Sequence, residues 1–545
     1  MSSSTVRLPD GQTFTVQPVF AGLFFKSDDL NRHHPSPFPI GWTIVIHTRD
    51  DETSNGRNDP DAMAVDQERP SSASAAGAAA SPSSERHTSH ESHVHSFSKP
   101  TLQKDSLYIS SISNPPASEF KEPASPTRQL AMMLWISLYW YFHQPAPSKT
   151  LPTTDNSRGT PADGRPRGDW RISIERDGVL RGRNLLPKLE RMGLIASLDS
   201  AVCWSFDDLD KEWDNMFVSQ QMFWQTPSRL FLFTLQPTSK HAMSPPGSPV
   251  SSSRPSTPVR HRETSPRYQQ AKSPVYQLAA DVPGASPPQN LLASPSFPVG
   301  PYFSSSHLPT YYPPAALQYT FSNNTRHPVR PKPPRMGEVF YTRFVPSVGK
   351  YLSFRVASSS SQPVPYLGPV SQSSAEASSD SHVHLTTLCD MVLMQMWMSK
   401  PRVAKFWGGY QANFLANALA SKHSFPVIAM WDGIPFGYFE IYWVKEDILG
   451  RYINNAQDWD RGIHVFIGEE WARGQVSAWL SSLAHWIFGA DYRTTSVCIE
   501  PRVDNIRFIQ HLQSGGFVGE QEVSFPHKQS WFGRLRRENW LGPSL

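Results

Sequence analysis

The stretch GIHVFIGEEWARGQ, residues 462–475, carries two features that could do chemistry: a histidine and a basic turn that leads into a helix. Its first half alternates between three aliphatic residues on one face and His464 and Phe466 on the other, which predicts a strand. Its second half passes through the turn at 468–474 into an apolar helical pattern. Two interpretations follow. Either a packed core histidine precedes an ordinary turn, or a proton acceptor lies beside an anion-binding helix start.

The turn has a composition suited to binding an anion. Backbone N–H groups at the start of a helix are unpaired and point outward, so an anion can bind there. Arg473 adds positive charge, and Gly474 allows the backbone to approach a ligand closely. The motif is short, so by itself it also fits a purely structural turn.

The segments that position these residues follow in a definite order. FPVIAMWDG and IPFGYFEIYWV predict a β-hairpin around the turn Asp432-Gly433. After the histidine strand come an amphipathic helix (GQVSAWLSSLAHWIF), a buried strand (TTSVCIEP), a short helix (NIRFIQHLQSGGF) and a last strand (EQEVSFPHK). Strand, turn, helix, strand, helix and strand together resemble the acyl-CoA-binding core of the GNAT acetyltransferases, in which this turn holds the pyrophosphate of coenzyme A.

A narrower resemblance covers about residues 383–528. The blocks WMSKPRVAKFW, VIAMWDGIPFGYFEIYWV, DRGIHVFIG, RG, IEPRVDNIRFIQHLQSGGF and PHK occur in this order. They resemble the siderophore-biosynthesis acyltransferases that make hydroxamates, including bacterial hydroxylysine acetyltransferases. LPDGQTFTVQPVF and SPTRQLAMMLWISLYWYFHQ near the N-terminus are similar to the fungal hydroxyornithine acyltransferases. One departure is that the usual Gln/Arg-x-x-Gly-x-Gly/Ala loop reduces here to Arg-Gly-Gln at 473–475.

This resemblance implies that His464 is the catalytic histidine and that Asp504, in EPRVDN, is its acidic partner. The alternative for Asp504 is that it caps the helix that follows. The chemistry suits such a pair, because a hydroxylamine nitrogen is largely neutral and nucleophilic at physiological pH. The enzyme must position this nitrogen against a thioester and remove a proton, which an imidazole oriented by a carboxylate can do. The resemblance also implies that a backbone N–H of the histidine strand binds the carbonyl oxygen.

Further site residues are expected around this pair. The resemblance implies that acyl-CoA is bound by Phe466, Ile467, Arg473, Gly474, Gln475 and Asn505. Four other residues are candidates for binding the amino-acid substrate: Trp407, Glu440, Tyr442 and Lys528. For Glu440 the substrate group is an α-ammonium, and the alternative is a carboxylate at a sheet edge facing water. Trp407 could equally pack in the core, and Lys528 could equally be a solvated lysine.

The chain predicts two α/β domains with mixed sheets, both GNAT-like, and long disordered insertions. The N-terminal domain spans 1–236, a Pro/Ser-rich linker spans 237–335, and the catalytic domain spans 336–545. Segments 51–99 and 145–168 are expected to be disordered, because they have too few large apolar residues to offset their ordering entropy. A strand is predicted in SRLFLFTL. The N-terminal copy is expected to be degenerate, since residues 1–236 show no comparable Arg-Gly turn before a long helix.

Composition restricts the class of protein. The net charge of +4 is spread without a long basic run, so a nucleic-acid partner is not indicated. Cys203, Cys389 and Cys498 lie far apart, without metal-type spacing, which fits a reducing compartment and no metal cofactor. The apolar run at 130–142 is too short to span a bilayer and predicts a buried helix, so we expect a soluble, intracellular protein without a membrane partner.

We therefore expect an acyl-CoA-dependent acyltransferase with hydroxyornithine as acceptor and acetyl-CoA as donor. The chain ends in Pro-Ser-Leu, which lacks the basic middle residue of a peroxisomal signal, so we expect a cytoplasmic enzyme. The alternative within the family is a peroxisomal enzyme that transfers an anhydromevalonyl group. An alternative of another class is a noncatalytic adaptor with GNAT-like domains. The sequence leaves the oligomeric state open, with a homodimer as one option.

Overall fold

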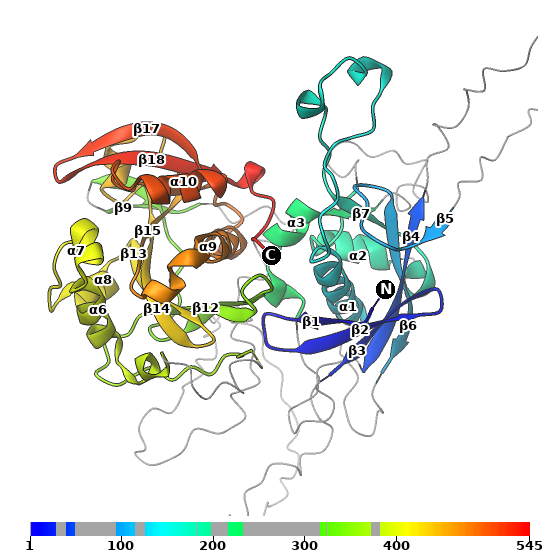
Figure 1. The fold of residues 1–545 in the computed structure, drawn as a ribbon, viewed down its shortest axis with the longest axis horizontal. Coiled ribbons are helices and arrows are strands. Elements are labelled where there is room, and N and C mark those ends of the chain that lie inside the picture. Colours follow the sequence, from blue (N-terminus) through cyan, green and yellow to red (C-terminus); the bar gives the residue numbers. More distant parts are fainter. Residues whose placement is uncertain are drawn as a thin grey trace, which may run out of the picture.

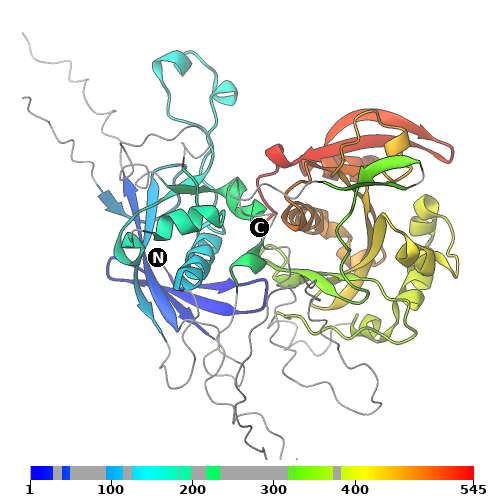
Figure 2. The same cartoon turned by 180° about the vertical axis from the view of Figure 1, so that it is seen from behind.

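The computed structural model describes residues 2–28, 40–49, 94–114, 126–182, 184–197, 216–232, 317–322, 324–371 and 382–545. These residues form two lobes, each built on a mixed β-sheet, with the C-terminus lying between them (Figures 1 and 2). Residues 50–93 and 233–316, which cover most of the predicted insertions, lie outside the described part of the chain. The predicted class of two GNAT-like α/β domains is confirmed.

The N-terminal sheet has the strand order β1-β2-β3-β4-β6-β7-β8, with β5 paired to β4. Its pairs are antiparallel except for β6 with β7, which are parallel. The strands are β1 (Ser4–Arg7), β2 (Thr13–Val19), β3 (Gly22–Ser27), β4 (Gly41–Arg49), β5 (Val94–Ser96), β6 (Asp105–Ser113), β7 (Arg171–Ile174) and β8 (Phe217–Ser219). The helices of this lobe are α1 (Pro126–Tyr141), α2 (Leu185–Arg191) and α3 (Gln220–Gln225).

Helix α1 confirms the buried helix predicted from the apolar run. Residues 129–141 are all buried, as expected for a helix that is apolar on every side. The indole N–H of Trp42 and the hydroxyl of Ser137, both enclosed by this packing, find partners, because Trp42 Nε1 donates to Ser137 Oγ at 2.9 Å and that hydroxyl donates to the Met133 carbonyl.

The C-terminal sheet has the order β11-β12-β13-β14-β15-β16-β18-β17. Again one pair is parallel, β15 with β16, and the others are antiparallel. The strands are β11 (Val339–Val345), β12 (Lys350–Val356), β13 (Ser424–Trp431), β14 (Ile434–Trp443), β15 (Arg461–Ile467), β16 (Ser496–Ile499), β17 (Val518–Phe525) and β18 (Lys528–Arg536). The predicted hairpin is β13–β14, and Asp432 and Gly433 at its turn both have positive φ, as a two-residue turn of this kind requires.

Helices cover both faces of this sheet (Figure 1). One core cluster packs α6 (Asp390–Met398), α7 (Pro401–Trp407) and α8 (Phe414–Ala420) against the face that carries Tyr438 and Phe466. The larger cluster packs α9 (Val476–Ala490) and α10 (Ile506–Ser514) against the opposite face, which carries Ile463. The alternation predicted for β15 is thus confirmed, with aliphatic residues on the α9 side and Phe466 on the α7 side.

The two lobes share one topological unit. In each, an antiparallel run leads through a helix to a parallel strand: β6–α1–β7 in the first lobe and β15–α9–β16 in the second. The last parallel pairs are Leu107 with Ile174 and Gly462 with Cys498. The parallel pairing of the first lobe ends on the opposite face, because Leu107 and Ile109 pack in the core with α1, whereas His464 lies on the face away from α9.

The lobes contact each other through α3. Gln221 and Gln225 donate side-chain N–H groups to the carbonyls of Glu538 at 2.7 Å and of Arg537 at 3.0 Å. Trp224 packs edge-on against His485 of α9, with ring centroids 5.5 Å apart. One continuous hydrophobic core contains residues of both sheets. The first lobe therefore supports the helix that lies behind the histidine strand.

Three sequence predictions about the connecting segments are wrong. Segment 145–168 is ordered, with 3-10 turns at Asp155–Ser157 and Ala162–Gly164 and a bridge between Thr150 and Arg167. SRLFLFTL begins with the 3-10 turn Ser228–Leu230 rather than a strand. Part of the predicted linker forms the hairpin β9 (Tyr319–Ser322) and β10 (Thr325–Pro328). Within the described ranges, no helix combines the length and apolar character that crossing a membrane requires.

The hairpin is anchored by a buried ion pair, which local composition does not reveal. Arg330 binds both carboxylate oxygens of Glu446 at 2.7 and 2.6 Å, and it lies over the ring of Trp443 at 4.3 Å. The side chains of Arg330 and Glu446 are 8% and 1% exposed. We expect Arg330→Ala to lower the free energy of unfolding of this lobe by about 3 kcal/mol, because it leaves a buried carboxylate without its charged partner. Urea denaturation followed by tryptophan fluorescence measures this.

The control for this prediction is Arg158→Ala. Arg158 pairs with Asp155 on the surface, where both side chains are largely exposed, so its loss should leave the unfolding midpoint unchanged. Equal midpoints for Arg330→Ala and Arg158→Ala would contradict the anchoring role.

Candidate active site

The site is built on neighbouring strands that place His464 opposite Glu440. In the β14–β15 ladder these two residues are directly paired, so their side chains leave the sheet on the same face. His464 Nδ1 lies 3.5 Å from Glu440 Oε2. The carboxylate of Glu440 also accepts a hydrogen bond from Ser424 Oγ at 2.9 Å, which fixes its orientation.

A second carboxylate reaches His464 across the parallel pair. Strands β15 and β16 pair only at Arg461 with Val497 and at Gly462 with Cys498. His464 and Glu500 each lie two residues beyond the last pair, so they point to the same face at the same level. Glu500 Oε1 lies 2.6 Å from His464 Nε2. The two strands are thus bridged by side chains at the point where their backbone pairing stops.

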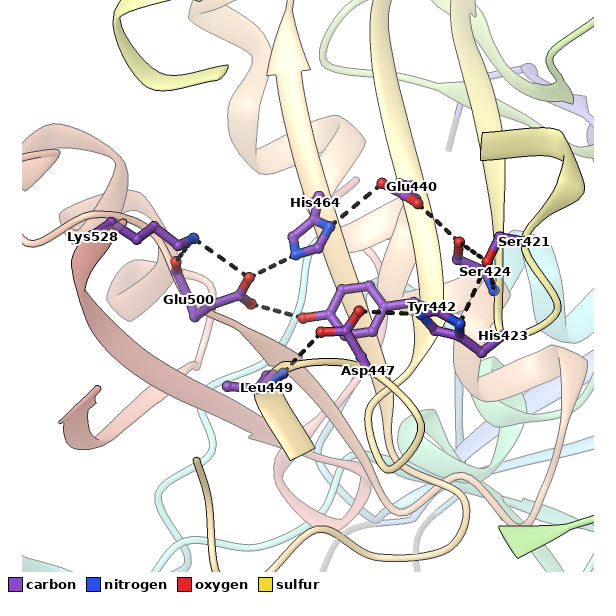
Figure 3. Close-up of polar contacts among 10 residues, drawn as sticks. All are labelled: Ser421, His423, Ser424, Glu440, Tyr442, Asp447, Leu449, His464, Glu500 and Lys528. Atoms are coloured by element: carbon purple, nitrogen blue, oxygen red, sulfur yellow. Dashed lines mark hydrogen bonds and ion pairs between the residues drawn. The ribbon is translucent and has the colours of Figure 1, made fainter. Parts of the chain in front are cut away.

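Glu500 is itself held by two further predicted site residues (Figure 3). Tyr442 donates its hydroxyl to Glu500 Oε2 at 2.7 Å, and Lys528 Nζ donates to the Glu500 carbonyl at 3.0 Å and lies 3.6 Å from Oε1. The ring of Tyr442 lies 4.4 Å from that of His464. A Cβ at Gly462 would come within 2.0 Å of the Tyr442 ring, so only glycine there admits this arrangement.

The charges of the trio are strongly coupled. Burial lowers the pKa of His464, but the negative charge of Glu500 and the contacts with both carboxylates outweigh it and raise this pKa well above its ordinary value. Burial raises the pKa of Glu500, but the positive charge of His464, and then that of Lys528, bring it down to about 2. For Glu440, burial is likewise outweighed by the contact with His464, and its pKa is lowered. The two carboxylates therefore favour the imidazolium form of His464.

The prediction that Asp504 partners His464 is wrong. Asp504 is half exposed, and both of its oxygens bind Arg502, at 2.8 and 2.5 Å. It lies six residues beyond the last parallel pair, past the point where a side chain can reach the imidazole, and Glu500 takes its place. Nor is Asp504 the helix cap, because α10 has Asn505 at its N-cap position.

Aromatic rings form a wall beside the imidazole. Trp407, at the end of α7, packs edge-on to His464 with ring centroids 6.2 Å apart. It also contacts Phe466 at 5.1 Å and Tyr438 at 5.8 Å, and Phe414 of α8 contacts both Trp407 and Tyr438. Trp407 and Phe466 therefore flank the same face as the charged trio. Phe466, predicted for acyl-CoA, packs in this wall.

The predicted anion turn adopts a 3-10 helix, Glu470–Gln475, directly before α9. Arg473 is half exposed and binds Glu470 at 2.7 Å. Arg402 of α7 binds the same carboxylate at 3.0 Å and donates to the carbonyls of Ile467 and Gly468 at the end of β15. Two cations thus share one exposed carboxylate, an arrangement that an incoming phosphate can replace.

The remaining predicted residues flank this turn. A Cβ at Gly474 would meet nothing within 4 Å, so open space surrounds it. Gln475 is the N-cap residue of α9, and its side chain forms no cap hydrogen bond. Asn505, at the start of α10, also forms none. The structure places Gly474 and Gln475 at the α9 start and Asn505 at the start of a different helix.

Sequence reasoning missed Glu500 and Arg402. Glu500 lies in the quoted block IEPRVDN, and its signal was its offset from the last parallel pair, equal to that of His464 on β15. Without the strand register that signal cannot be used. Arg402 lies in the quoted block WMSKPRVAKFW, directly after the Pro401 with which α7 begins in the structure.

Comparison with known proteins places this geometry in a class. Residues 386–525 match the family model described as an acetyltransferase (GNAT) domain. This range contains the turn, the charged trio of Glu440, His464 and Glu500, and the aromatic wall, but not Lys528. The chain is a GNAT acyltransferase that uses acyl-CoA.

A more specific match covers nearly the whole chain. It is 52% identical over 547 residues to the N5-hydroxyornithine acetylase sidL of Beauveria bassiana, covering 97% of this chain and 100% of that protein. The chain belongs to the N5-hydroxyornithine acetylase family. It is also 35% identical to the N(5)-hydroxyornithine:cis-anhydromevalonyl coenzyme A-N(5)-transacylase SIDF of the same fungus, over 39% of this chain and 42% of that protein. The N(6)-hydroxylysine O-acetyltransferase of Escherichia coli is 36% identical, over 36% of this chain and 56% of that protein.

The coupling of the trio leads to a direct titration test. We expect the imidazole of His464, followed by NMR, to titrate above pH 6.5, and Glu500→Gln to move its pKa downward, because that substitution removes the main negative charge that favours the imidazolium. Glu522→Gln, an exposed carboxylate on β17, is the matched control and should leave the titration unchanged. A His464 titration that is the same in Glu500→Gln and in the wild type would contradict the assignment.

Proposed function

We propose that this protein transfers an acetyl group from acetyl-CoA to the hydroxylamino nitrogen of N5-hydroxyornithine, giving a hydroxamate for siderophore biosynthesis. The family to which the chain belongs supports the acceptor. The observation that carries the mechanism is the position of His464 between Glu440 and Glu500, where the parallel strands stop pairing.

His464 acts as the general base. The hydroxylamine nitrogen attacks the thioester carbonyl, so a C–N bond forms while the C–S bond breaks. His464 accepts the proton of the nitrogen and returns it to the departing thiolate of coenzyme A. Glu500 orients the imidazole and stabilises its charged form, and a backbone N–H of β15 beyond Gly462 binds the carbonyl oxygen.

Substrate binding prepares the base. In the free enzyme the raised pKa favours the protonated form of His464. A protonated imidazole cannot accept a further proton, so the base must first become neutral. The α-ammonium of hydroxyornithine binds Glu440 and places a like charge near the imidazolium, which lowers the pKa of His464. Glu500 keeps a cationic partner when that proton leaves, because Lys528 lies 3.6 Å from its carboxylate. The α-ammonium of the substrate and Lys528 thus supply positive charge to the two carboxylates when His464 becomes neutral.

Acyl-CoA binds with its phosphates at the start of α9. Arg473 and Arg402 exchange the carboxylate of Glu470 for phosphate oxygens, and the open space at Gly474 admits the ligand. Trp407 and Phe466 line the acceptor side. We also propose acetyl as the acyl group and the cytoplasm as the compartment. The related transacylase SIDF is named for the larger anhydromevalonyl group. Anhydromevalonyl-CoA is therefore the second donor to test.

The base has a kinetic signature. We expect His464→Ala to lower kcat by about 10²–10⁴-fold with the protein still folded, the usual contribution of a general base. For the wild type, kcat/KM should rise with pH as His464 loses its proton, with a midpoint above pH 6.5. In Glu500→Gln this midpoint should shift to lower pH and the plateau should fall, because both the charge and the orientation are lost. Steady-state rates with acetyl-CoA and hydroxyornithine measure both. A folded His464→Ala with wild-type kcat rules out the base.

The phosphate site predicts two opposite effects. We expect Arg473→Ala to raise the KM for acetyl-CoA about tenfold and to leave that for hydroxyornithine unchanged, as for the loss of one partly exposed charge-assisted hydrogen bond. Glu470→Gln should lower the KM for acetyl-CoA, since it removes the carboxylate that competes for the two arginines. If neither variant changes this KM, the turn has only a structural role.

Comparing kcat/KM for acetyl-CoA and anhydromevalonyl-CoA tests the acyl group.

A further inference from the structure

The turn between β16 and α10 holds the end of helix α7 through one arginine. Arg502 binds Asp504 through Nε and Nη2 at 2.8 and 2.5 Å, and its third nitrogen, Nη1, donates to the carbonyl of Lys405 at 3.0 Å. Its guanidinium carbon also lies 4.8 Å from the ring centre of Phe406. The two bonds to Asp504 fix the plane of the guanidinium, and this leaves Nη1 for the helix.

The carbonyl that Arg502 binds is one that the helix cannot satisfy by itself. Lys405 lies among the last four residues of α7, whose carbonyls have no partner within the helix. A cation at this end also complements the negative end of the helix. Beyond it, Gly408 ends α7 with φ of +79°, and a Cβ at Gly408 or Gly409 would meet nothing within 4 Å. Because open space surrounds Gly408 and Gly409, the position of the α7 end depends on contacts such as the one with Arg502.

The residue at this end is Trp407, the aromatic neighbour of the base. It is the last residue of α7, and its ring contacts His464 at 6.2 Å and Phe466 at 5.1 Å. A movement of the helix end therefore moves this ring relative to the imidazole. Asp504 and Trp407 are thereby connected through Arg502.

We propose that Arg502, fixed by Asp504, is a positioning residue that sets the acceptor pocket through Trp407. It does not touch the reacting atoms; it holds the last turn of α7 so that Trp407 forms the wall against which the hydroxylamine side chain lies. The inference rests on the proposed function only in that the acceptor binds beside His464. The segment 500–504 then serves the site twice, with Glu500 on the imidazole and Arg502 on the wall.

The test is a double-mutant cycle between Arg502 and Trp407. We expect Arg502→Ala to raise the KM for hydroxyornithine about tenfold and to leave the KM for acetyl-CoA unchanged, because only the acceptor wall is displaced. In the background of Trp407→Ala, the same substitution should have no further effect on this KM, since the residue through which it acts is gone. Asp504→Asn should raise the KM in the same direction by less, because one acceptor oxygen remains.

Two variants separate positioning from general stability. Arg502→Lys keeps the charge but cannot bind Asp504 and the helix at once, so it should resemble Arg502→Ala. Arg493→Ala is the matched control, because Arg493 forms the same kind of forked pair with Asp491 and its side chain is equally exposed, at 31%. Its loss should leave both KM values unchanged, whatever it does to the melting temperature.

Three results would overturn the proposal: additive effects of Arg502→Ala and Trp407→Ala, an equal rise in both KM values, or no change in either. Should Arg502→Ala not fold, Arg502→Lys and Asp504→Asn carry the same cycle. Turnover of hydroxyornithine by the wild type tests the proposed function separately. If the wild type uses another hydroxylamine, the KM of that acceptor takes its place in the cycle.

Discussion

The contact between His464 and Glu500 is the interaction on which the site depends. It exists because β15 and β16 pair with each other for only two residues, although β15 remains paired with β14 as far as Ile467. Beyond the last pair no backbone pairing joins these two strands, and the side chains of His464 and Glu500, each two residues past it, bridge them at 2.6 Å. In the proposed reaction, a backbone N–H of β15 beyond this point binds the carbonyl oxygen of the thioester. One change of strand pairing thus provides both the proton acceptor and the space for the acyl donor.

Charge balance explains why several polar residues surround this contact. A buried carboxylate is costly unless it is paired, and Glu500 has three partners: His464, Tyr442 and Lys528. Glu440 has His464 and the neutral Ser424. Of the two carboxylates, Glu440 is therefore the one whose charge is more readily shared with a cationic substrate. The asymmetry gives the two glutamates different roles although both touch the same imidazole.

The two lobes show how one topology can be kept while the chemistry is present in only one of them. Both contain the unit of strand, helix and parallel strand, and in both the parallel pairing is two residues long. Two residues beyond the last parallel pair, however, the first lobe has Ile109, whose side chain packs in the core on the side of α1, whereas His464 lies on the face away from α9. The first lobe contributes instead through α3, which contacts α9 behind the active strand.

Local sequence determined which segments form elements and which chemistry they bear. Alternation in GIHVFIG fixed the strand and the face of His464, the Asp432-Gly433 turn fixed the hairpin, and the apolar run fixed α1 as a buried helix, since each depends on neighbours in the chain. Partners distant in sequence were decided by the tertiary structure. Asp504 and Glu500 lie four residues apart in one quoted block, and only the register of two parallel strands, 36 residues apart at His464 and Glu500, selects Glu500. Segment 145–168 is ordered by contacts within itself, such as the bridge between Thr150 and Arg167 and the hydrogen bond from Thr154 N–H to Ser157, which its composition did not indicate. Periodicity and turn chemistry are local properties, whereas register and ion pairing arise only when strands from different parts of the chain meet.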